Sequence, residues 1–301
     1  MLIIISICKP VLADDSSLDP VDDISHLSDD FSDPERLSEW QRIHAQEGWS
    51  NKLKRIDVNQ TAKGALFMEP HTSVWFYDYV APFLFKAVDG DFMVTTRVRV
   101  KGTDTDYPES IYSLAGLMLR APRKDAPYRD NRNWAKDRET YVFAVTGTTE
   151  VSGQPILETK STIRSYPLVK HYKLKKKGWL DIRLVRTGKT VLVLYRYPSG
   201  RWVLHERFYR PDLPTSVQVG LMAYSDFATI REKHWYMPWE YNVRTITDGK
   251  ADLQAEFDYV DFRRIAVPTS TNAWLREKGI ELDDTRIDNS KLFALLPFID
   301  D

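Results

Sequence analysis

Residues 179–208 read WLDIRLVRTGKTVLVLYRYPSGRWVLHERF, and this stretch predicts three consecutive antiparallel strands. Apolar and polar side chains alternate within 179–188, 190–197 and 200–208, which is the period-two pattern of a strand with two different faces. Gly188 and Gly200 stand in the short connections between these segments, where tight hairpin turns favour glycine. The stretch therefore predicts two successive β-hairpins.

Seven further segments show the same alternation, and Gly, Pro, Asp and Asn separate them. They are ALFMEP (65–70), DFMVTTRVRV (91–100), SLAGLMLR (113–120), TYVFAVTG (140–147), ILETKSTIR (156–164), SVQVGLMAYS (216–225) and LQAEFDYVDFRR (253–264). About ten short strands without helical spacing between them predict an all-β protein, an antiparallel sandwich of jelly-roll type. Segments 272–280 and 288–299 have helical spacing, with Asp288 or Ser290 as candidate caps, and predict a short helical C-terminal tail.

The triplet Gly-Leu-Met occurs twice, in AGLMLR at 115–120 and in VGLMAYS at 219–225. One face of these segments carries Ala115, Leu117, Leu119, Val219, Leu221 and Ala223, and the other carries Gly116, Met118, Arg120, Gly220, Met222 and Tyr224. We expect the first set to face the interior between two sheets and the second set to form an open floor under a ligand. Glycine in the middle of a strand often marks the close approach of another group. The alternative is that loops or the tail cover this face.

Segment 179–208 resembles the signature of laminin-G-like modules of the concanavalin A-like lectin and glucanase superfamily. It is most similar to bacterial modules of unknown function associated with glycoside hydrolases. The matching positions are Trp179, Arg183, Leu184, Arg186, Gly188, Tyr195, Gly200 and Trp202. DDFSD at 29–33 is similar to the opening strand of that family, and 255–264 to its closing strand. The resemblance implies two stacked curved sheets, with any glycan lying across the concave one.

Aromatic side chains are concentrated in HTSVWFYDYV (71–80) and KHWYMPWEYN (233–242), and a polar loop at 121–138 adds two more. Aromatic planes combined with hydrogen-bonding groups suit the flat C–H faces and hydroxyls of sugars, although packing alone can also explain such clusters. The expected ligand-binding residues are Trp75, Tyr77, Arg120, Tyr224, Trp235, Trp239 and Tyr241. The expected partner is a polysaccharide or oligosaccharide. If the basic segment 169–179 borders the groove rather than forming a solvated loop, that partner is expected to be anionic.

Catalytic motifs are incomplete. Glu256, Asp258 and Asp261 have the spacing of the E-x-D-x-x-E motif of the superfamily's retaining glucanases, but the motif ends in Asp and lies on the expected closing strand. Glu158 with His171 or Tyr172 could form a lyase-type pair, without a surrounding lyase signature. The alternative to binding is therefore a glycoside hydrolase or polysaccharide lyase acting in the same groove, and a third alternative is a non-catalytic structural or interaction module.

No cofactor is expected to be required, but a structural calcium ion is one candidate. Asp30 and Asp261 would meet where the opening and closing strands pair, and related sandwiches often hold calcium at that corner. Asp30 alone could instead cap a turn.

Composition excludes several classes of function. The 301 residues include 42 basic and 43 acidic side chains, and this near-zero net charge gives no reason to expect nucleic-acid binding. Residues 2–7 form a short apolar stretch, and the segment ends on a small residue, Ala13. Residues 1–13 therefore resemble a truncated export signal, which predicts a periplasmic or extracellular protein. Cys8, the single cysteine, lies in this segment, and no apolar segment reaches membrane-spanning length. We expect a lead-in at 14–28, the sandwich at 29–266 and the helical tail at 267–301.

Overall fold

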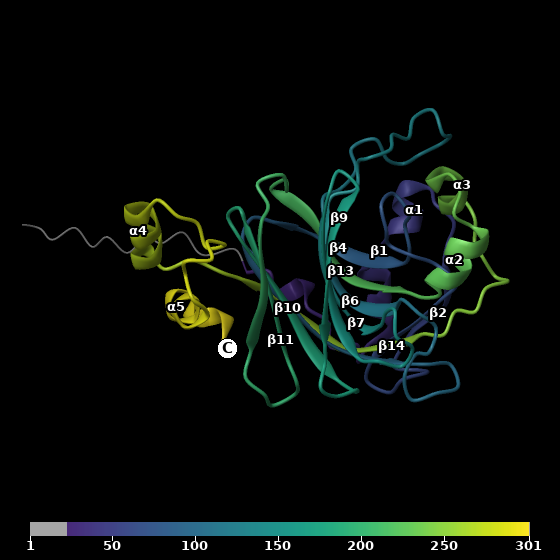
Figure 1. The fold of residues 1–301 in the computed structure, drawn as a ribbon, viewed down its shortest axis with the longest axis horizontal. Helices are drawn as coiled ribbons and strands as arrows, with labels where there is room; N and C mark the ends of the chain where they lie inside the picture. Colours follow the sequence, from purple (N-terminus) through teal and green to yellow (C-terminus); the bar gives the residue numbers. More distant parts are fainter. Residues whose placement is uncertain (1–22, 301) are drawn as a thin grey trace, which may run out of the picture.

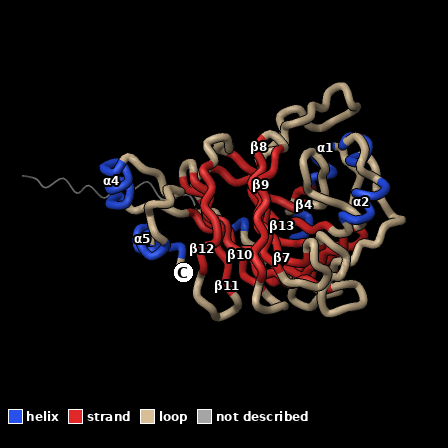
Figure 2. The backbone as a smooth tube through the Cα atoms, viewed as in Figure 1, coloured by secondary structure: helices blue, strands red, loops and turns tan. Residues whose placement is uncertain are grey.

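The computed structural model describes residues 23–300, so the predicted export signal and Cys8 lie outside the described residues. Two antiparallel sheets of seven strands each pack face to face, as Figure 1 and Figure 2 show. The first sheet has the order β1 (Gln41–Arg42), β4 (Phe83–Asp89), β13 (Ser216–Tyr224), β6 (Ser113–Arg120), β7 (Tyr141–Thr148), β8 (Ile156–Ile163) and β9 (Tyr166–Lys173). The second has the order β12 (Val203–Tyr209), β11 (Thr190–Arg196), β10 (Leu180–Thr187), β5 (Phe92–Lys101), β14 (Gln254–Arg264), β3 (Leu66–Pro70) and β2 (Leu53–Val58).

The all-β sandwich and all ten predicted strands are confirmed, with shifts of a few residues at their ends. Four strands were missed, namely β1, β2, β4 and β9. Strand β9 contains part of the basic segment 169–179, and it is an exposed edge strand in which polar side chains occupy both faces. Such a strand lacks the alternation on which the prediction depends.

The expected opening strand at 29–33 is wrong. Asp29 forms a single antiparallel bridge to Val260, and Phe31 then takes a left-handed backbone conformation with φ of 53°. The Asp29 carboxylate accepts hydrogen bonds from the Phe31 amide and from Trp40 Nε1. The segment therefore turns instead of continuing along β14, because its own buried aspartate holds the turn.

The two Gly-Leu-Met segments are adjacent antiparallel strands, with Gly220 opposite Met118 and Met222 opposite Gly116. Leu117 and Leu221 lie in the core between the sheets, and Met118 and Met222 belong to a second apolar cluster on the outer face of the same sheet. The predicted difference between the two faces of these strands is confirmed. The prediction of an open floor is wrong, because both faces are buried.

A layer that we call the cap covers the outer face of the first sheet, which we call the cap sheet. The cap consists of residues 71–82 and 121–138 with the short helices α1 (Ile43–Glu47), α2 (Phe227–Lys233) and α3 (Pro238–Asn242). Figure 1 shows these helices on one side of the sandwich.

Helices α4 (Thr269–Lys278) and α5 (Asn289–Leu295) form the predicted tail on the opposite side of the sandwich, with the Asp288 side chain capping α5 through the Lys291 amide at 2.8 Å. Leu275, Leu292 and Leu296 of the tail share an apolar cluster with side chains from β10, β11 and β12. We call the second sheet the tail sheet. Three short 3₁₀ helices complete the described chain, namely η1 (Ser25–Leu27), η2 (Pro34–Glu39) and η3 (Pro297–Ile299).

The repeated glycines allow close backbone approach within the cap sheet. A Cβ atom on Gly220 would lie 1.9 Å from the Leu84 carbonyl oxygen, and one on Gly116 would lie 2.3 Å from that of Ala144. Both neighbouring atoms belong to paired strands of the same sheet and cannot move away independently. Glycine is therefore required at these positions by the packing of the strands themselves.

We expect Gly220→Ala to lower the free energy of unfolding by about 3 kcal/mol or more, because backbone atoms of β4 must move to admit the methyl group. Chemical denaturation monitored by tryptophan fluorescence measures the change. Gly153→Ala is the control, since nothing lies within 4 Å of its added Cβ and only its positive φ opposes the substitution. We expect this control to cost about 1 kcal/mol. An equal loss in both variants would contradict the role of close approach.

Candidate functional site

The cap leaves a pocket of about 300 Å³ open near the β8 and β9 edge of the cap sheet. Its floor comes from β8, β9 and β13, and its walls come from residues 71–82, the loops before β6 and after β7, and helix α2. The lining residues are Val74, Phe76, Tyr112, Glu150, Glu158, Lys160, Val169, His171, Tyr224 and Phe227. We call this cavity the cap pocket. It combines apolar and aromatic walls with a polar floor, which is the usual character of a small-molecule site.

Glu158 lies at the centre of the polar floor and is fully buried. Its Oε2 lies 2.8 Å from His171 Nε2 on the neighbouring strand, where the two residues are directly paired. Its Oε1 accepts a hydrogen bond from the Tyr224 hydroxyl at 3.2 Å and lies 3.3 Å from Lys160 Nζ. Lys160 also donates to the Trp75 carbonyl at 2.9 Å, which ties the cap to the floor. Three donors from three strands thus converge on one carboxylate.

The charged groups in the floor shift one another's pKa values. Burial alone would raise the pKa of Glu158, but the adjacent Lys160 and His171 outweigh it and hold that pKa below its usual value. The hydrogen bond to Glu158 raises the pKa of His171, so the imidazole tends to be a cationic donor. Burial, reinforced by the Glu158 charge, raises the pKa of Tyr224 and keeps its hydroxyl protonated. The floor therefore offers an ionised acceptor surrounded by donors, rather than a protonated carboxyl.

Exposed aromatic side chains lie beside the cap pocket. Trp235 and Tyr77 are 43% and 39% exposed, and we call this pair the aromatic rim. The Trp235 ring stacks on Tyr79 with centroids 4.6 Å apart and planes inclined by 6°, so its orientation is held from below. Trp235 also contacts Phe76 and Phe227, which line the cap pocket. The aromatic surface therefore runs from the rim into the pocket without interruption.

The sequence predicted seven ligand-binding residues, and the structure places only some of them at the cap pocket and the aromatic rim. Tyr77 and Trp235 form the aromatic rim, and Tyr224 lies in the pocket floor. Trp75 and Tyr241 are fully buried inside the cap, where Tyr241 accepts a hydrogen bond from the Val74 amide. The half-buried Trp239 packs against Trp49, Tyr128 and Trp134. These three side chains shape the cap and have no face in the cap pocket.

Arg120, the seventh expected residue, is fully buried in an ion network away from the cap pocket. It forms a bidentate pair with Glu139 at 2.7 and 2.8 Å, contacts Glu47 at 2.7 Å and donates to Gln218. Two carboxylates around one guanidinium raise the pKa of Arg120 and keep it charged. The network joins β6 and β13 to α1 and to the loop before β7, and so attaches the cap to its sheet.

The pocket residues that sequence reasoning did not assign are Val74, Phe76, Tyr112, Glu150, Lys160, Val169 and Phe227. Glu158 and His171 were considered only as an isolated pair. A usable signal was present in ILETKSTIR, because Glu158 and Lys160 occupy the same face of a strand whose neighbours are buried. A buried charged pair requires partners, and such pairs mark candidate functional sites.

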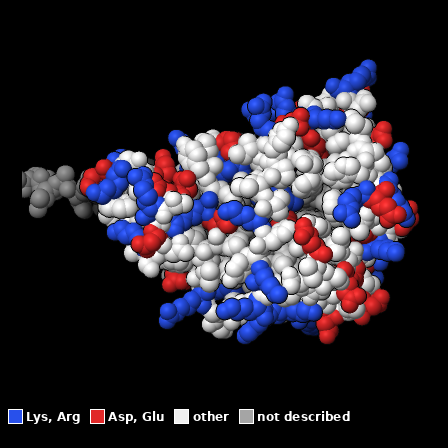
Figure 3. All heavy atoms as spheres, in the orientation of Figure 1, with Lys and Arg blue, Asp and Glu red and all other residues white. Residues whose placement is uncertain are grey.

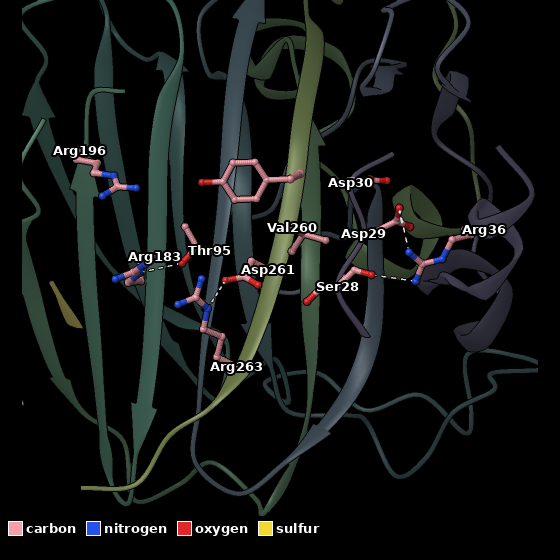
Figure 4. A pocket seen from close by; sticks show the side chains of 11 residues that line it. Ser28, Asp29, Asp30, Arg36, Thr95, Arg183, Arg196, Val260, Asp261 and Arg263 are labelled. Atoms are coloured by element: carbon pink, nitrogen blue, oxygen red, sulfur yellow. Dashed lines mark hydrogen bonds and ion pairs between the residues drawn. The ribbon is translucent and has the colours of Figure 1, made fainter. Parts of the chain in front are cut away.

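The expected calcium residues line a different pocket, on the outer face of the tail sheet. Asp30 and Asp261 both border this cavity of about 510 Å³, together with Arg36, Arg183, Arg196 and Arg263, and Figure 4 shows its side chains. Asp30 Oδ1 accepts from the Ser32 amide at 3.0 Å and from its hydroxyl at 2.7 Å, as in a capped turn. Asp261 accepts from Arg263 Nε at 2.6 Å. Within residues 23–300, no group of three or more His, Cys, Asp or Glu side chains could hold a metal ion.

The glucanase-like motif also lies on the outer face of the tail sheet. Glu256 is paired with Lys101 at 2.8 Å and with Arg99, and Asp258 lies 3.4 Å from Arg97. These carboxylates are neutralised by neighbouring strands and are remote from the cap pocket.

In residues 23–300, none of the helices has the length and apolar character needed to span a membrane. Figure 3 shows basic and acidic side chains interspersed on the surface, in keeping with the net charge of −1.

No family model matches the sequence, and no curated protein matches it. A functionally unknown protein from Saccharomyces cerevisiae aligns with a TM-score of 0.50 and 15% identity over 76% of this chain and 98% of its own. The Bacteroides ovatus xyloglucan PUL protein GH43B aligns with a TM-score of 0.52 and 16% identity over 79% of this chain and 39% of its own. The bifunctional GH43-CE protein of Bacteroides eggerthii has a TM-score of 0.52 and 14% identity, with 79% and 26% covered. These likenesses show a shared β-sandwich fold, and this chain spans well under half of the two GH43 proteins.

We expect Arg120→Gln to lower the free energy of unfolding by about 3–5 kcal/mol, because Glu47 would lose the cation that compensates its burial and Glu139 would keep only Arg123. Denaturant unfolding at pH 7 measures this. Arg132→Gln is the control, since that side chain is 87% exposed and its ion-pair partner within residues 23–300 is Asp130. A loss below about 1 kcal/mol in Arg120→Gln would show that the network does not hold the cap.

We expect His171 to titrate above its ordinary pKa of 6.5 and to fall toward that value in Glu158→Gln, because the carboxylate stabilises the imidazolium. Since the folded pKa is raised, the stabilisation is complete below pH 6.5 and is lost as pH rises through the folded value. NMR titration of the imidazole and unfolding experiments from pH 5.5 to 8.5 check both statements. A His171 titration that is identical in the two proteins would contradict the assigned contact.

Proposed function

We propose that this protein binds carbohydrate at the cap pocket and the aromatic rim, as a module in a glycan-utilisation context. One sugar unit enters the pocket among Phe76, Tyr112 and Phe227, and neighbouring units pass over Trp235 and Tyr77. The observation that carries the proposal is the continuous aromatic surface that leads from exposed rings to a buried polar floor. Aromatic planes bind the C–H faces of sugars, and the exposed polar side chains of the pocket, Glu150 and His171, can supply hydrogen bonds to hydroxyl groups.

The shared fold supports a carbohydrate role only in a general way. Two of the aligned proteins carry GH43, a glycoside hydrolase designation, in their names, and this chain resembles a part of each. Fold likeness does not by itself specify function, so the proposal rests on the site. The exported location expected from residues 1–13 would suit such a role and stays a prediction.

We propose that the ligand is a neutral glycan. In the cap pocket, Lys160 and His171 are both paired with Glu158, and Glu150 adds a second carboxylate, so the pocket has no excess of positive charge to attract an anionic sugar. The basic segment 169–179 contributes His171 and Val169 to the pocket, but Lys170 extends to the other sheet and pairs with Glu206 at 2.8 Å. The anionic ligand expected if this segment bordered the groove is therefore the less favoured alternative.

Catalysis in the same pocket is the second candidate, favoured by the convergence of Glu158, His171 and Tyr224. A retaining glycosidase needs one carboxyl held protonated as the acid, whereas the cations beside Glu158 lower its pKa. A lyase needs an unprotonated base, whereas the raised pKa values of His171 and Tyr224 favour their protonated forms. Burial lowers the pKa of Lys160, but this side chain is engaged by Glu158 and the Trp75 carbonyl. We therefore infer binding rather than either reaction.

We expect Trp235→Ala to weaken binding of a neutral oligosaccharide about tenfold or more, because the exposed ring supplies a stacking surface. A panel of neutral and acidic polysaccharides identifies the ligand, and isothermal titration with a derived oligosaccharide measures affinity. Tyr209→Ala is the matched control, since Tyr209 is a 47% exposed aromatic on β12 of the other sheet. Equal affinity of the wild type and Trp235→Ala for every ligand found would refute the proposed surface.

The same panel tests catalysis by the release of reducing ends or unsaturated products. Product release that disappears in Glu158→Gln, with the protein still folded, would favour the enzyme over the binding module. Retention of oligosaccharide without any product favours binding.

A further inference from the structure

The side chains that line the cap pocket contact one another in a closed circuit. On the apolar side, Phe76 packs against Phe227 of α2, with ring centroids 6.4 Å apart. Phe227 packs in turn against Tyr112 at 5.3 Å, and the Tyr112 ring reaches His171 on β9 at 6.1 Å. The Phe227 amide also donates to the Ile111 carbonyl at 3.3 Å, which joins α2 to the loop before β6. This part of the wall is therefore continuous from Phe76 to β9.

The polar side of the pocket completes the circuit. His171 pairs with Glu158 at 2.8 Å, and Glu158 lies 3.3 Å from Lys160 Nζ. The Lys160 ammonium lies over the Phe76 ring, 5.1 Å from its centroid, and donates to the Trp75 carbonyl beside it. These contacts return to the first side chain of the circuit, so the lining of the cavity surrounds it on all sides.

The cap sheet closes the cavity from below. Glu158 on β8 and Tyr224 on β13 form the floor, and both side chains are fully buried. Their neighbours along these strands, Leu157 and Ala223, belong to the core between the two sheets. Closely packed protein therefore lies beneath the floor, and the cavity is a blind pocket.

Tyr112, in the wall, has a backbone conformation that few bulky residues adopt. Its φ is 56°, in the left-handed region, and Tyr77 at the aromatic rim has a φ of 49°. Such a conformation is costly for a residue with a Cβ atom, and it is kept where the surrounding structure requires one placement. The hydroxyl of the half-buried Tyr112 lies 3.4 Å from the carboxylate of Glu150, which also lines the pocket. The strain is therefore located at the wall of the pocket, as is common at ligand sites.

The volume of the pocket limits what can enter it. The cavity of about 300 Å³ is at the lower end of the range for small-molecule sites, roughly 300–1,000 Å³. This volume suits a single sugar ring. The aromatic rim continues from the wall, because Trp235 contacts both Phe76 and Phe227. The rim therefore marks the side on which the rest of a glycan chain leaves the pocket.

Building on the proposed function, we propose that the cap pocket recognises the terminal unit of a glycan chain and that the next unit stacks on Trp235. A terminal unit carries one linkage, which leaves the blind pocket over the aromatic rim. An internal unit carries two linkages, and the second would meet the continuous wall of Phe227, Tyr112 and His171. The ligand is therefore a chain end, in place of the internal units of a polysaccharide.

Counting chain ends tests this proposal. A neutral polysaccharide that binds the wild type is cleaved to shorter fragments, so that the number of ends rises at constant mass of sugar. Isothermal titration measures the amount of protein bound at saturation, which we expect to rise in proportion to the number of ends. Saturation that depends only on the mass of sugar would overturn the inference and leave the proposed function intact. Failure to bind any glycan would overturn both.

Oligosaccharides with modified ends identify the terminus that enters the pocket. Borohydride reduction opens the sugar ring at the reducing end, and a bulky ether blocks the non-reducing end. We expect one modification to abolish binding and the other to leave it unchanged, and the one that abolishes binding marks the recognised terminus. An oligosaccharide modified at both ends that binds as tightly as the unmodified chain would contradict recognition of a terminus.

Two substitutions of Tyr112 test the wall. Tyr112→Gly removes the ring, and glycine suits the positive φ, so the backbone gives no reason for a loss of stability. We expect the affinity for the terminal unit to fall about tenfold in this variant. Tyr112→Phe is the matched control, because it keeps the ring and loses only the hydroxyl contact with Glu150. Equal affinity in Tyr112→Gly and the wild type would overturn the assignment of this wall.

Oligosaccharides of increasing length separate the pocket from the rim. We expect the affinity of the wild type to rise over the first two or three units and then to level off, because the rim consists of two rings. Trp235→Ala should remove the gain from the second unit and leave the affinity for a monosaccharide unchanged, whereas Tyr209→Ala should change neither. An affinity that continues to rise with every added unit would indicate an open groove and overturn the inference.

Discussion

The cap sheet is apolar on both faces, and this constraint governs the rest of the molecule. Leu117 and Leu221 fill the core toward the tail sheet, while Met118 and Met222 on the reverse face need cover of their own. Exposing the apolar second face of such a sheet to water would cost free energy, so loops and short helices pack over it. Any ligand on this sheet must therefore use a gap in the cap, and the gap lies where polar residues replace apolar ones on β8 and β9.

The polar network around Glu158 makes the gap in the cap polar and also fixes its shape. Glu158 is buried without access to water and is stable there because His171, Lys160 and Tyr224 surround it. Lys160 extends this network to the cap through the Trp75 carbonyl. A single carboxylate thus organises the floor of the pocket and part of the cover beside it. A change in the charge of Glu158 should therefore alter both ligand binding and the packing of the cap.

The two outer faces of the sandwich have different chemistry. The cap side presents aromatic rings around a carboxylate, and the tail side presents arginine–aspartate pairs across β11, β10, β5 and β14. Arg183 and Trp202, two positions of the laminin-G-like signature seen in the sequence, are in direct contact, with 4.0 Å between the guanidinium carbon and the ring centroid. These two positions of the resemblance therefore reflect packing on the tail sheet rather than contacts at the cap pocket. The two pockets are separated by both sheets.

Local pattern and long-range packing contributed different parts of this structure. The period of two in segments such as 179–188 and 113–120 was sufficient to predict ten strands, their inner faces and the sandwich, because side-chain direction along a strand depends only on the neighbouring residues. The same reasoning failed for β9, whose two faces each mix polar and apolar side chains, and for 29–33, where Asp29 holds a turn. It also could not tell the exposed Trp235 from the buried Trp75, because the burial of Trp75 depends on contacts with Phe83 and with Tyr141, which is far along the chain.

The cap pocket depends on tertiary structure rather than on local sequence pattern. Glu158, His171 and Tyr224 meet only because β8 pairs with β9 and the β13 side chain reaches across the sheet under the cap. Sequence alone determined which residues could face outward on each strand. Which of those faces stayed open, and which charges came together there, depended on how distant loops packed, because burial is a property of the whole fold.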